Sequence, residues 1–157
     1  DDAATDKEIT SLSFSPDGLT VAVGTKGGLV LCYDLRMDAP VATKDHNYGL
    51  PVVKTYFSSK AQLFTADLKI MKIWDINSPS KTVANVQPPA DINEFMVYPD
   101  TGLILFALEQ PKMCAYYIPD VGPAPKWASF LDSLTEELEE DKNVTMYDDF
   151  KFVTADE

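Results

Sequence analysis

The sequence predicts an all-β fold built from about three copies of a four-stranded antiparallel unit. A turn motif, Phe14-Ser15-Pro16-Asp17-Gly18, returns in weaker form at 57–60 and 97–102. A second anchor lies downstream in each copy, as Tyr33-Asp34, Trp74-Asp75 and Tyr117-Ile118. Both anchors recur at intervals of about forty residues, which is the period of β-propeller blades. We therefore expect a partial β-propeller.

Each copy contains short segments in which apolar and polar residues alternate, as in half-buried strands. Turn residues separate these segments, because Pro presets φ and Gly tolerates positive φ. The first blade, 9–43, has expected strands at 9–14, 20–24, 29–34 and 39–43. The second, 52–86, has them at 52–57, 62–66, 70–75 and 82–86. The third, 92–118, shows only three, at 92–97, 103–108 and 113–118.

The chain outside these blades has a different composition. Residues 1–8 form an acidic linker, 119–126 a proline-rich connector, and 127–157 an acidic segment in which we expect a C-terminal α-helix and an extended tail. Propellers typically have about 4–8 blades, so three do not close one. We expect the missing blades to precede Asp1 in a longer parent chain.

Charge is concentrated at the two ends of the chain. The net charge is −12, and 11 acidic against 3 basic residues lie between Asp120 and Glu157. A basic face that would neutralise phosphates is absent from the sequence, which disfavours direct RNA contact by this segment. No apolar run approaches the ~20 residues of a membrane span. We predict no membrane association, no cofactor and no small-molecule substrate.

The dipeptide Trp74-Asp75 and its weaker copy Tyr33-Asp34 resemble WD repeats. In that family a His, an Asp and the Trp form a buried polar network, and the resemblance assigns this structural role to His46, Asp67 and Trp74. The fit is imperfect, because Asp67 stands about one residue earlier than the common spacing. His46 is the only histidine, and no second His or thiolate cluster accompanies it as a catalytic or metal-binding partner would. The sequence predicts no catalytic residue, no metal ligand and no enzyme.

The acidic segment 127–157 contains a helical pattern with one apolar face, at Trp127, Leu131, Leu134 and Leu138. This face either packs on the propeller or docks on another protein. The stretch 147–153 either adds to a partner as an extended strand or is disordered. The residues that we predict to bind a partner are Trp127, Phe130, Leu131, Leu134, Leu138, Tyr147, Phe150 and Phe152.

Several motifs resemble the nucleolar protein 10 family, and the similarity runs from about Glu8 to Thr154. The motifs are Gly122-Pro123-Ala124-Pro125-Lys126-Trp127, Leu134-Thr135-Glu136-Glu137-Leu138-Glu139-Glu140, Lys44-Asp45-His46 with Tyr48-Gly49-Leu50-Pro51, and Tyr147-Asp148-Asp149 with Lys151-Phe152-Val153-Thr154. Ala128 and Phe150 depart from the pattern, where Cys and Tyr are usual.

This resemblance implies a non-catalytic scaffold of ribosome biogenesis in the nucleus and nucleolus. Its expected place is the small-subunit processome, which matures the small-subunit ribosomal RNA precursor. Its expected partners are other assembly proteins of the small-subunit pre-ribosome. The alternative is a generic WD-repeat adaptor in another nuclear complex, such as a ubiquitin ligase or a chromatin assembly. The motifs of the tail favour the first function.

Overall fold

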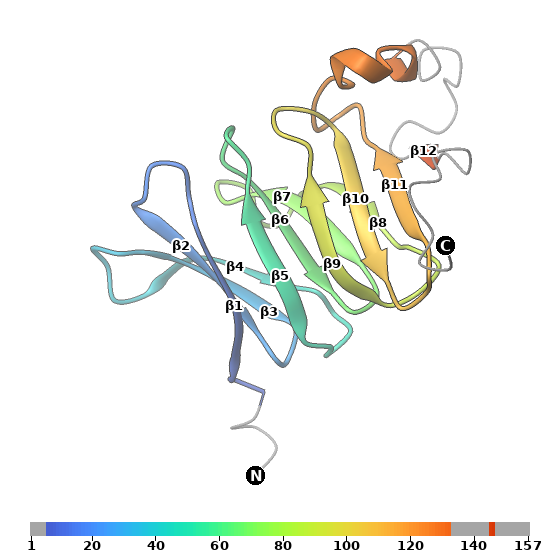
Figure 1. The fold of residues 1–157 in the computed structure, drawn as a ribbon. Helices are drawn as coiled ribbons and strands as arrows, with labels where there is room; N and C mark the ends of the chain where they lie inside the picture. Colours follow the sequence, from blue (N-terminus) through green and yellow to red (C-terminus); the bar gives the residue numbers. More distant parts are fainter. Residues whose placement is uncertain (1–5, 133–144, 147–157) are drawn as a thin grey trace. The chain divides into compact units, whose positions relative to one another are not determined.

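A computed structural model describes residues 6–132 and 145–146. The chain forms two compact units, Asp1–Gln87 and Pro88–Glu157. Within the described residues the regular elements are strands, apart from a 3-10 turn and the helical residues 130–132, and the strand pairs are antiparallel. The predicted all-β class and its blades of four antiparallel strands are confirmed (Figure 1). No helix in the part of the chain that the structure describes is long and apolar enough to cross a membrane.

The first unit contains two four-stranded sheets, each in simple sequential order. The strands of the first sheet are β1 (Ile9–Phe14), β2 (Thr20–Thr25), β3 (Leu29–Asp34) and β4 (Pro40–Asp45). The strands of the second are β5 (Val52–Phe57), β6 (Gln62–Asp67), β7 (Met71–Asp75) and β8 (Thr82–Val86). Each strand lies within two residues of its expected position, because alternation and turn chemistry are local signals.

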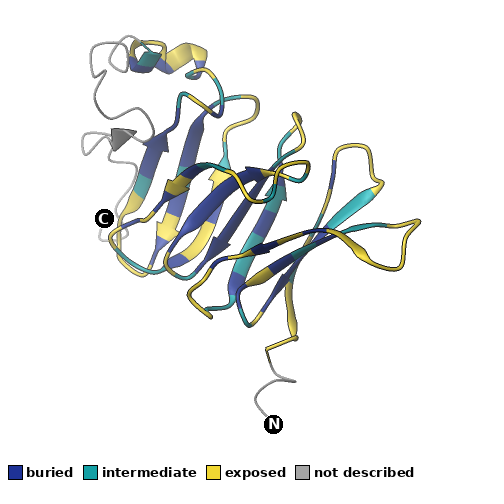
Figure 2. Ribbon diagram, turned by 180° about the vertical axis from the view of Figure 1, so that it is seen from behind, coloured by how far each residue is buried: buried dark blue, intermediate teal, exposed yellow. Residues whose placement is uncertain are grey.

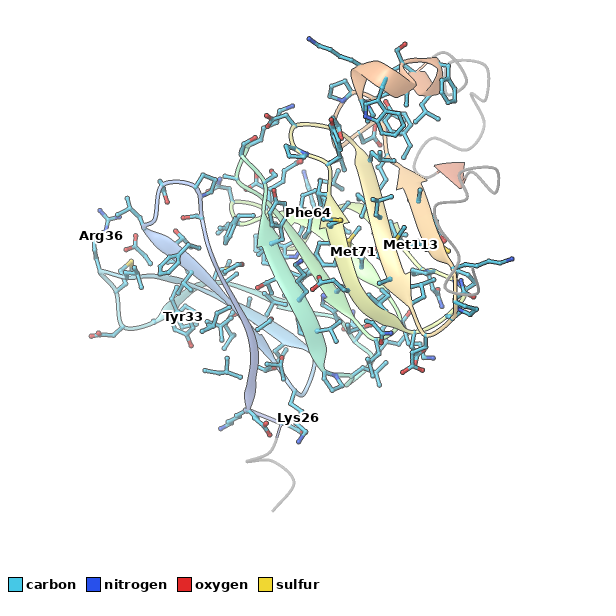
Figure 3. All side chains as sticks on the ribbon, in the orientation of Figure 1. Lys26, Tyr33, Arg36, Phe64, Met71 and Met113 are labelled. Atoms are coloured by element: carbon cyan, nitrogen blue, oxygen red, sulfur yellow. The ribbon has the colours of Figure 1, made fainter. Side chains whose placement is uncertain are left out.

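Turn residues define the ends of the strands. Between β1 and β2, the Ser15 N–H donates to the carbonyl of Thr20 at 2.8 Å, and Gly18 adopts a φ of 72°. After β3, Arg36 forms an ion pair with Asp34 at 2.7 Å in an exposed turn (Figure 3). Because these turns are short, strands that follow one another in the sequence are neighbours in the sheet.

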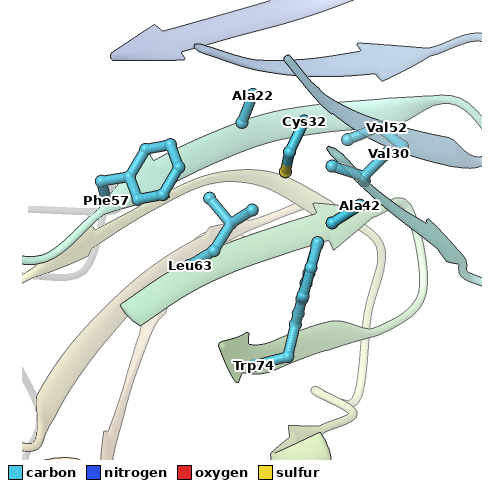
Figure 4. Close-up of a cluster of buried hydrophobic side chains, with 8 residues drawn as sticks. All are labelled: Ala22, Val30, Cys32, Ala42, Val52, Phe57, Leu63 and Trp74. Atoms are coloured by element: carbon cyan, nitrogen blue, oxygen red, sulfur yellow. The ribbon is translucent and has the colours of Figure 1, made fainter. Parts of the chain in front are cut away.

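Apolar side chains from both sheets form the core of the first unit (Figure 4). Its members are Ala22, Val30, Cys32, Ala42, Val52, Phe57, Leu63 and Trp74. Full burial of one such large aliphatic or aromatic side chain contributes about 2 kcal/mol relative to exposure. Strand β1 lies beside β5, where Ser13 Oγ donates to Thr55 Oγ1 at 3.0 Å. The two sheets therefore pack face to face through small residues of the first and large residues of the second.

The second unit contains one sheet in the order β12-β11-β10-β9. Its strands are β9 (Ile92–Val97), β10 (Leu103–Leu108), β11 (Met113–Tyr117) and β12 (Thr145–Met146). Phe106 is at its centre, with ring centroids 6.2 Å from Phe95 and 5.4 Å from Tyr116. Burial is concentrated along β10 and β11 (Figure 2).

The fourth strand of this sheet does not follow β11 directly. Strand β12 pairs Thr145 with Tyr117 and Met146 with Tyr116. The sequence shows only three strands in the third repeat because the fourth comes from far along the chain. Periodicity within a blade cannot reveal a strand that lies beyond the connector and the helical segment.

Candidate functional site

A buried polar network joins β4, β6 and β7 of the first unit. His46, directly after β4, places Nδ1 3.0 Å from Oδ2 of Asp67 and Nε2 2.8 Å from Oγ1 of Thr65. The indole N–H of Trp74 donates to the same Thr65 hydroxyl at 3.1 Å. All four side chains are 0% exposed. The structure thus brings together the three residues predicted for this network and adds Thr65 as the link between them.

Hydrogen-bond capacity fixes how this network is connected. A hydroxyl donates one hydrogen bond and accepts two. The ionised Asp67 carboxylate can only accept, so His46 Nδ1–H donates to it. The Thr65 hydroxyl accepts from Trp74, and its oxygen lies 2.8 Å from His46 Nε2 and 3.4 Å from the Lys72 carbonyl, to which it can donate. The network therefore fixes the position of the chain after β4 on the second sheet.

Asp67 also holds the turn that follows β6. Its Oδ1 accepts the backbone N–H groups of Lys69 at 2.6 Å and Ile70 at 2.8 Å. Burial disfavours the charged form of Asp67, but the hydrogen bonds from His46 and from these two amides outweigh burial and lower its pKa. The carboxylate is therefore ionised, buried and fully occupied by internal donors.

A buried lysine closes the outer side of Trp74. The ammonium of Lys44 donates to the carbonyl of Pro79 at 2.7 Å and to Oγ1 of Thr82 at 2.8 Å. It also lies 5.8 Å from the centroid of the Trp74 ring. Burial, with a smaller effect of nearby Lys72, lowers the pKa of Lys44. These contacts hold β4 to the outer strand β8.

The second unit has a different kind of site where the chain leaves β11. After the connector, the chain forms a 3-10 turn, η1 (Lys126–Ala128), and is helical over residues 130–132. Ala128 and Leu131 are 0% and 1% exposed and pack with Tyr117. The Tyr117 hydroxyl donates to Oδ1 of Asp132, which also accepts the N–H of Ala124 at 3.2 Å. This helical turn is therefore anchored on the sheet by apolar and polar contacts together.

The same turn carries two large aromatic side chains on its outer side. Trp127 is 54% and Phe130 50% exposed. Tyr98, 44% exposed in the turn between β9 and β10, meets Trp127 edge-on with ring centroids 6.2 Å apart. We call Tyr98, Trp127 and Phe130 the aromatic surface. Figure 1 shows the β9–β10 turn and the helical turn at the same end of this sheet.

The predicted partner-binding residues therefore separate into groups. Trp127 and Phe130 are about half exposed, whereas Leu131 is buried inside the second unit. The reason is η1: a 3-10 turn has about 3.0 residues per turn, so Trp127 and Leu131 do not share the face that a continuous α-helix would give them. The remaining predicted residues lie outside the described part of the chain: Leu134, Leu138, Tyr147, Phe150 and Phe152.

Two residues of these sites were not predicted from the sequence. Thr65 stands two residues before Asp67 in β6, so period-two alternation places both on one face of the strand. Tyr98 occupies the turn position that Ser15 and Ser58 hold in the first two repeats. Comparing the three repeats would have identified Tyr98, because an aromatic residue there replaces the turn serine of the other two.

Antiparallel four-stranded sheets repeated along the chain define blades of a β-propeller. The same architecture is found in the Cps50 (Swd1) β-propeller domain of Myceliophteria thermophila, with a TM-score of 0.61. That match is 19% identical and covers 69% of this chain and 35% of the other. It supports the fold.

Sequence comparison identifies the family. The model for "Nucleolar protein 10-like, N-terminal domain" matches residues 1–142, and the chain belongs to this family. It is 51% identical to human nucleolar protein 10 over 147 residues, which is 93% of this chain and 21% of that protein. It is 42% identical over 154 residues to the Saccharomyces cerevisiae ribosome biogenesis protein ENP2, covering 96% of this chain and 22% of that protein. The chain thus spans about a fifth of the length of these relatives.

Proposed function

We propose that this chain is part of a non-catalytic scaffold protein of ribosome biogenesis that works in the nucleolus. Its relatives support this proposal, because one is named a nucleolar protein and another a ribosome biogenesis protein. The finer assignment is the small-subunit processome, where the protein assists maturation of the small-subunit ribosomal RNA precursor. It does so by holding other assembly proteins in place.

The observation that carries a scaffold function is the exposed aromatic surface on an anchored turn. Monomeric proteins seldom expose large apolar patches, and such patches mark sites of protein interaction. Tyr and Trp are enriched at the energetic centres of protein interfaces because they bury a large area and retain a polar atom. The turn is held by Leu131 and Asp132, so its outward-facing rings are presented rather than buried.

The buried network supports a structural role for the polar residues of the second sheet. General acid–base catalysis requires a group within hydrogen-bond reach of substrate. His46 and Asp67 are 0% exposed and are paired with each other, with Thr65 and with backbone amides. The hydrogen bonds of His46 and Asp67 therefore stabilise the blade, and the scaffold function does not require these two side chains to be exposed to solvent.

Charge supports proteins rather than RNA as direct partners of this segment. The net charge of −12 is concentrated near the two ends of the chain, and the sequence has no basic cluster that would neutralise phosphates. The mechanism is positional: rigid blades present loops and an aromatic surface, and neighbouring assembly factors bind to them.

Gradient sedimentation of the tagged full-length protein from cell extract tests this function. The small-subunit ribosomal RNA precursor is probed across the fractions, with an RNase-treated extract as the control. We expect co-migration with a large precursor particle that is lost after RNase treatment. Migration as a small complex free of precursor RNA would show that the proposed function is wrong, although the fold would stand.

A further inference from the structure

We propose that the aromatic surface binds a basic, arginine-containing segment of a protein partner. This inference rests on the proposed scaffold function and specifies the chemistry of one partner. It starts from Tyr98, Trp127 and Phe130, which bring three exposed rings to one end of the third blade.

Three features fix the geometry of this surface before any partner binds. Leu131 and Ala128 pack under the helical turn, and Asp132 accepts hydrogen bonds from the Tyr117 hydroxyl and the Ala124 N–H. The β9–β10 turn is tied to the connector, because the Gly102 N–H donates to the carbonyl of Pro123 at 3.0 Å. A Cβ at Gly102 would lie 2.1 Å from the carbonyl oxygen of Ile118, so only glycine permits this approach. The rings of Tyr98 and Trp127 are thus held on two segments that are bonded to each other.

Charge indicates a cationic ligand. The described part of the second unit between Pro88 and Asp132 contains 6 acidic and 2 basic residues. Two of the acidic residues are exposed: Asp100, in the β9–β10 turn that also carries Tyr98, and Asp120, in the connector that leads to the helical turn. The faces of Trp and Tyr attract cations, and acidic surroundings add to that attraction.

Arginine fits better than lysine. Its planar guanidinium stacks on an aromatic face while its N–H groups pair with carboxylates, whereas the lysine ammonium is compact and strongly hydrated. Single-stranded RNA also stacks on aromatic side chains, but its binding requires a positively charged groove along the phosphates. Lys126 is the one basic residue in the connector and helical turn between 119 and 132, which does not make such a groove.

The test uses the full-length protein and fluorescein-labelled peptides in which several arginines are spaced by glycine and serine. Matched peptides carry lysine or glutamine at the arginine positions, and oligo-uridine and a proline-rich peptide serve as alternative ligands. Wild type is compared with Trp127→Ala/Phe130→Ala. The control is Tyr48→Ala, which removes an aromatic of similar exposure (53%) from the loop between β4 and β5.

We expect the double substitution to weaken binding of the arginine peptide about tenfold, as loss of desolvated cation–π contacts would. The lysine peptide should bind more weakly than the arginine peptide, the glutamine peptide should not bind, and Tyr48→Ala should behave as wild type. The inference is overturned if arginine-peptide binding is the same in the double variant, or if only oligo-uridine or the proline-rich peptide shows binding that depends on Trp127. Sedimentation of the wild type is scored separately, so that failure of the peptide result with normal particle association refutes this inference alone.

Discussion

The two tryptophans of this chain lie in opposite environments. Trp74 is 0% exposed, with its indole N–H bonded to Thr65 and its ring beneath Lys44. Trp127 is 54% exposed on a turn that is itself anchored by buried residues. In the second blade the aromatic side chain stabilises the sheet, whereas in the third blade Leu131 stabilises the turn and Trp127 remains outside. A half-exposed tryptophan on a turn that buried residues anchor is available for binding.

Among the substitutions that test this comparison, replacing His46 by Ala should cause the largest loss of stability. It removes the donor to Asp67 Oδ2 and the His46 contact of the Thr65 hydroxyl, and a buried polar atom that loses its partner costs about 1–3 kcal/mol. Two such groups and a cavity predict a loss of about 3 kcal/mol or more in the free energy of opening of the second sheet. Hydrogen–deuterium exchange of peptides covering β6 and β7 in the full-length protein measures this loss. Unchanged protection of these strands would remove the network from the account of stability.

Replacing Leu131 by Ala should cause the next largest loss of stability. Truncating a buried leucine typically costs about 2–5 kcal/mol, and a site near the surface belongs toward the lower end of that range. The loss should be confined to the anchored turn and the end of β11, with no change in the second sheet. The same exchange experiment, read on peptides covering 113–132, checks it. Faster exchange throughout both units would mean that the turn is not a local element.

Acid should weaken the second blade through Asp67. The pKa of this group is lowered in the folded protein from the ordinary value of 3.8, so its stabilising contribution is present above the unfolded pKa. That contribution is lost progressively as pH falls below about 5 and through the lowered folded pKa. Exchange protection of β6 and β7 should therefore fall with pH in this range, after correction for the intrinsic exchange rate. The variant Asp67→Asn should be less stable at neutral pH and should lose this part of the pH dependence.

Replacing Trp127 and Phe130 by Ala should have the smallest effect on stability. Both side chains are about half exposed, and surface substitutions away from buried features usually change stability by within about 0.5 kcal/mol. Thermal unfolding of the full-length double variant should therefore match wild type. A loss as large as that of Leu131→Ala would show that these rings are structural, which would contradict the comparison with Trp74.

The sequence predicts the strands of this chain well, because the signals are local. Alternating residues and the Ser15–Gly18 turn specify β1 and β2 without reference to any distant residue. Strand β12 was missed because its partner Tyr117 lies beyond a connector and a helical segment. Its pairing depends on tertiary contact, which periodicity does not record.

The sites divide in the same way. The resemblance to WD repeats placed His46, Asp67 and Trp74 in one network. In the structure His46 contacts Asp67 directly and is linked to Trp74 through Thr65. The predicted apolar face of the helical segment was based on an α-helix with 3.6 residues per turn from Trp127 onward. This segment instead begins with a 3-10 turn, and in it Leu131 is buried and Trp127 is exposed. Spacing alone cannot distinguish these two helical geometries over a single turn.

The most direct test of the central claim is gradient sedimentation of the full-length Trp127→Ala/Phe130→Ala variant beside wild type, with precursor RNA probed in every fraction. If the aromatic surface binds a partner, the variant should leave the precursor particle and sediment as free protein, while exchange protection of its blades stays at the wild-type level. If the variant remains on the particle in wild-type amounts, the exposed rings are not a binding site for the assembly, and the contrast between Trp74 and Trp127 has no functional meaning.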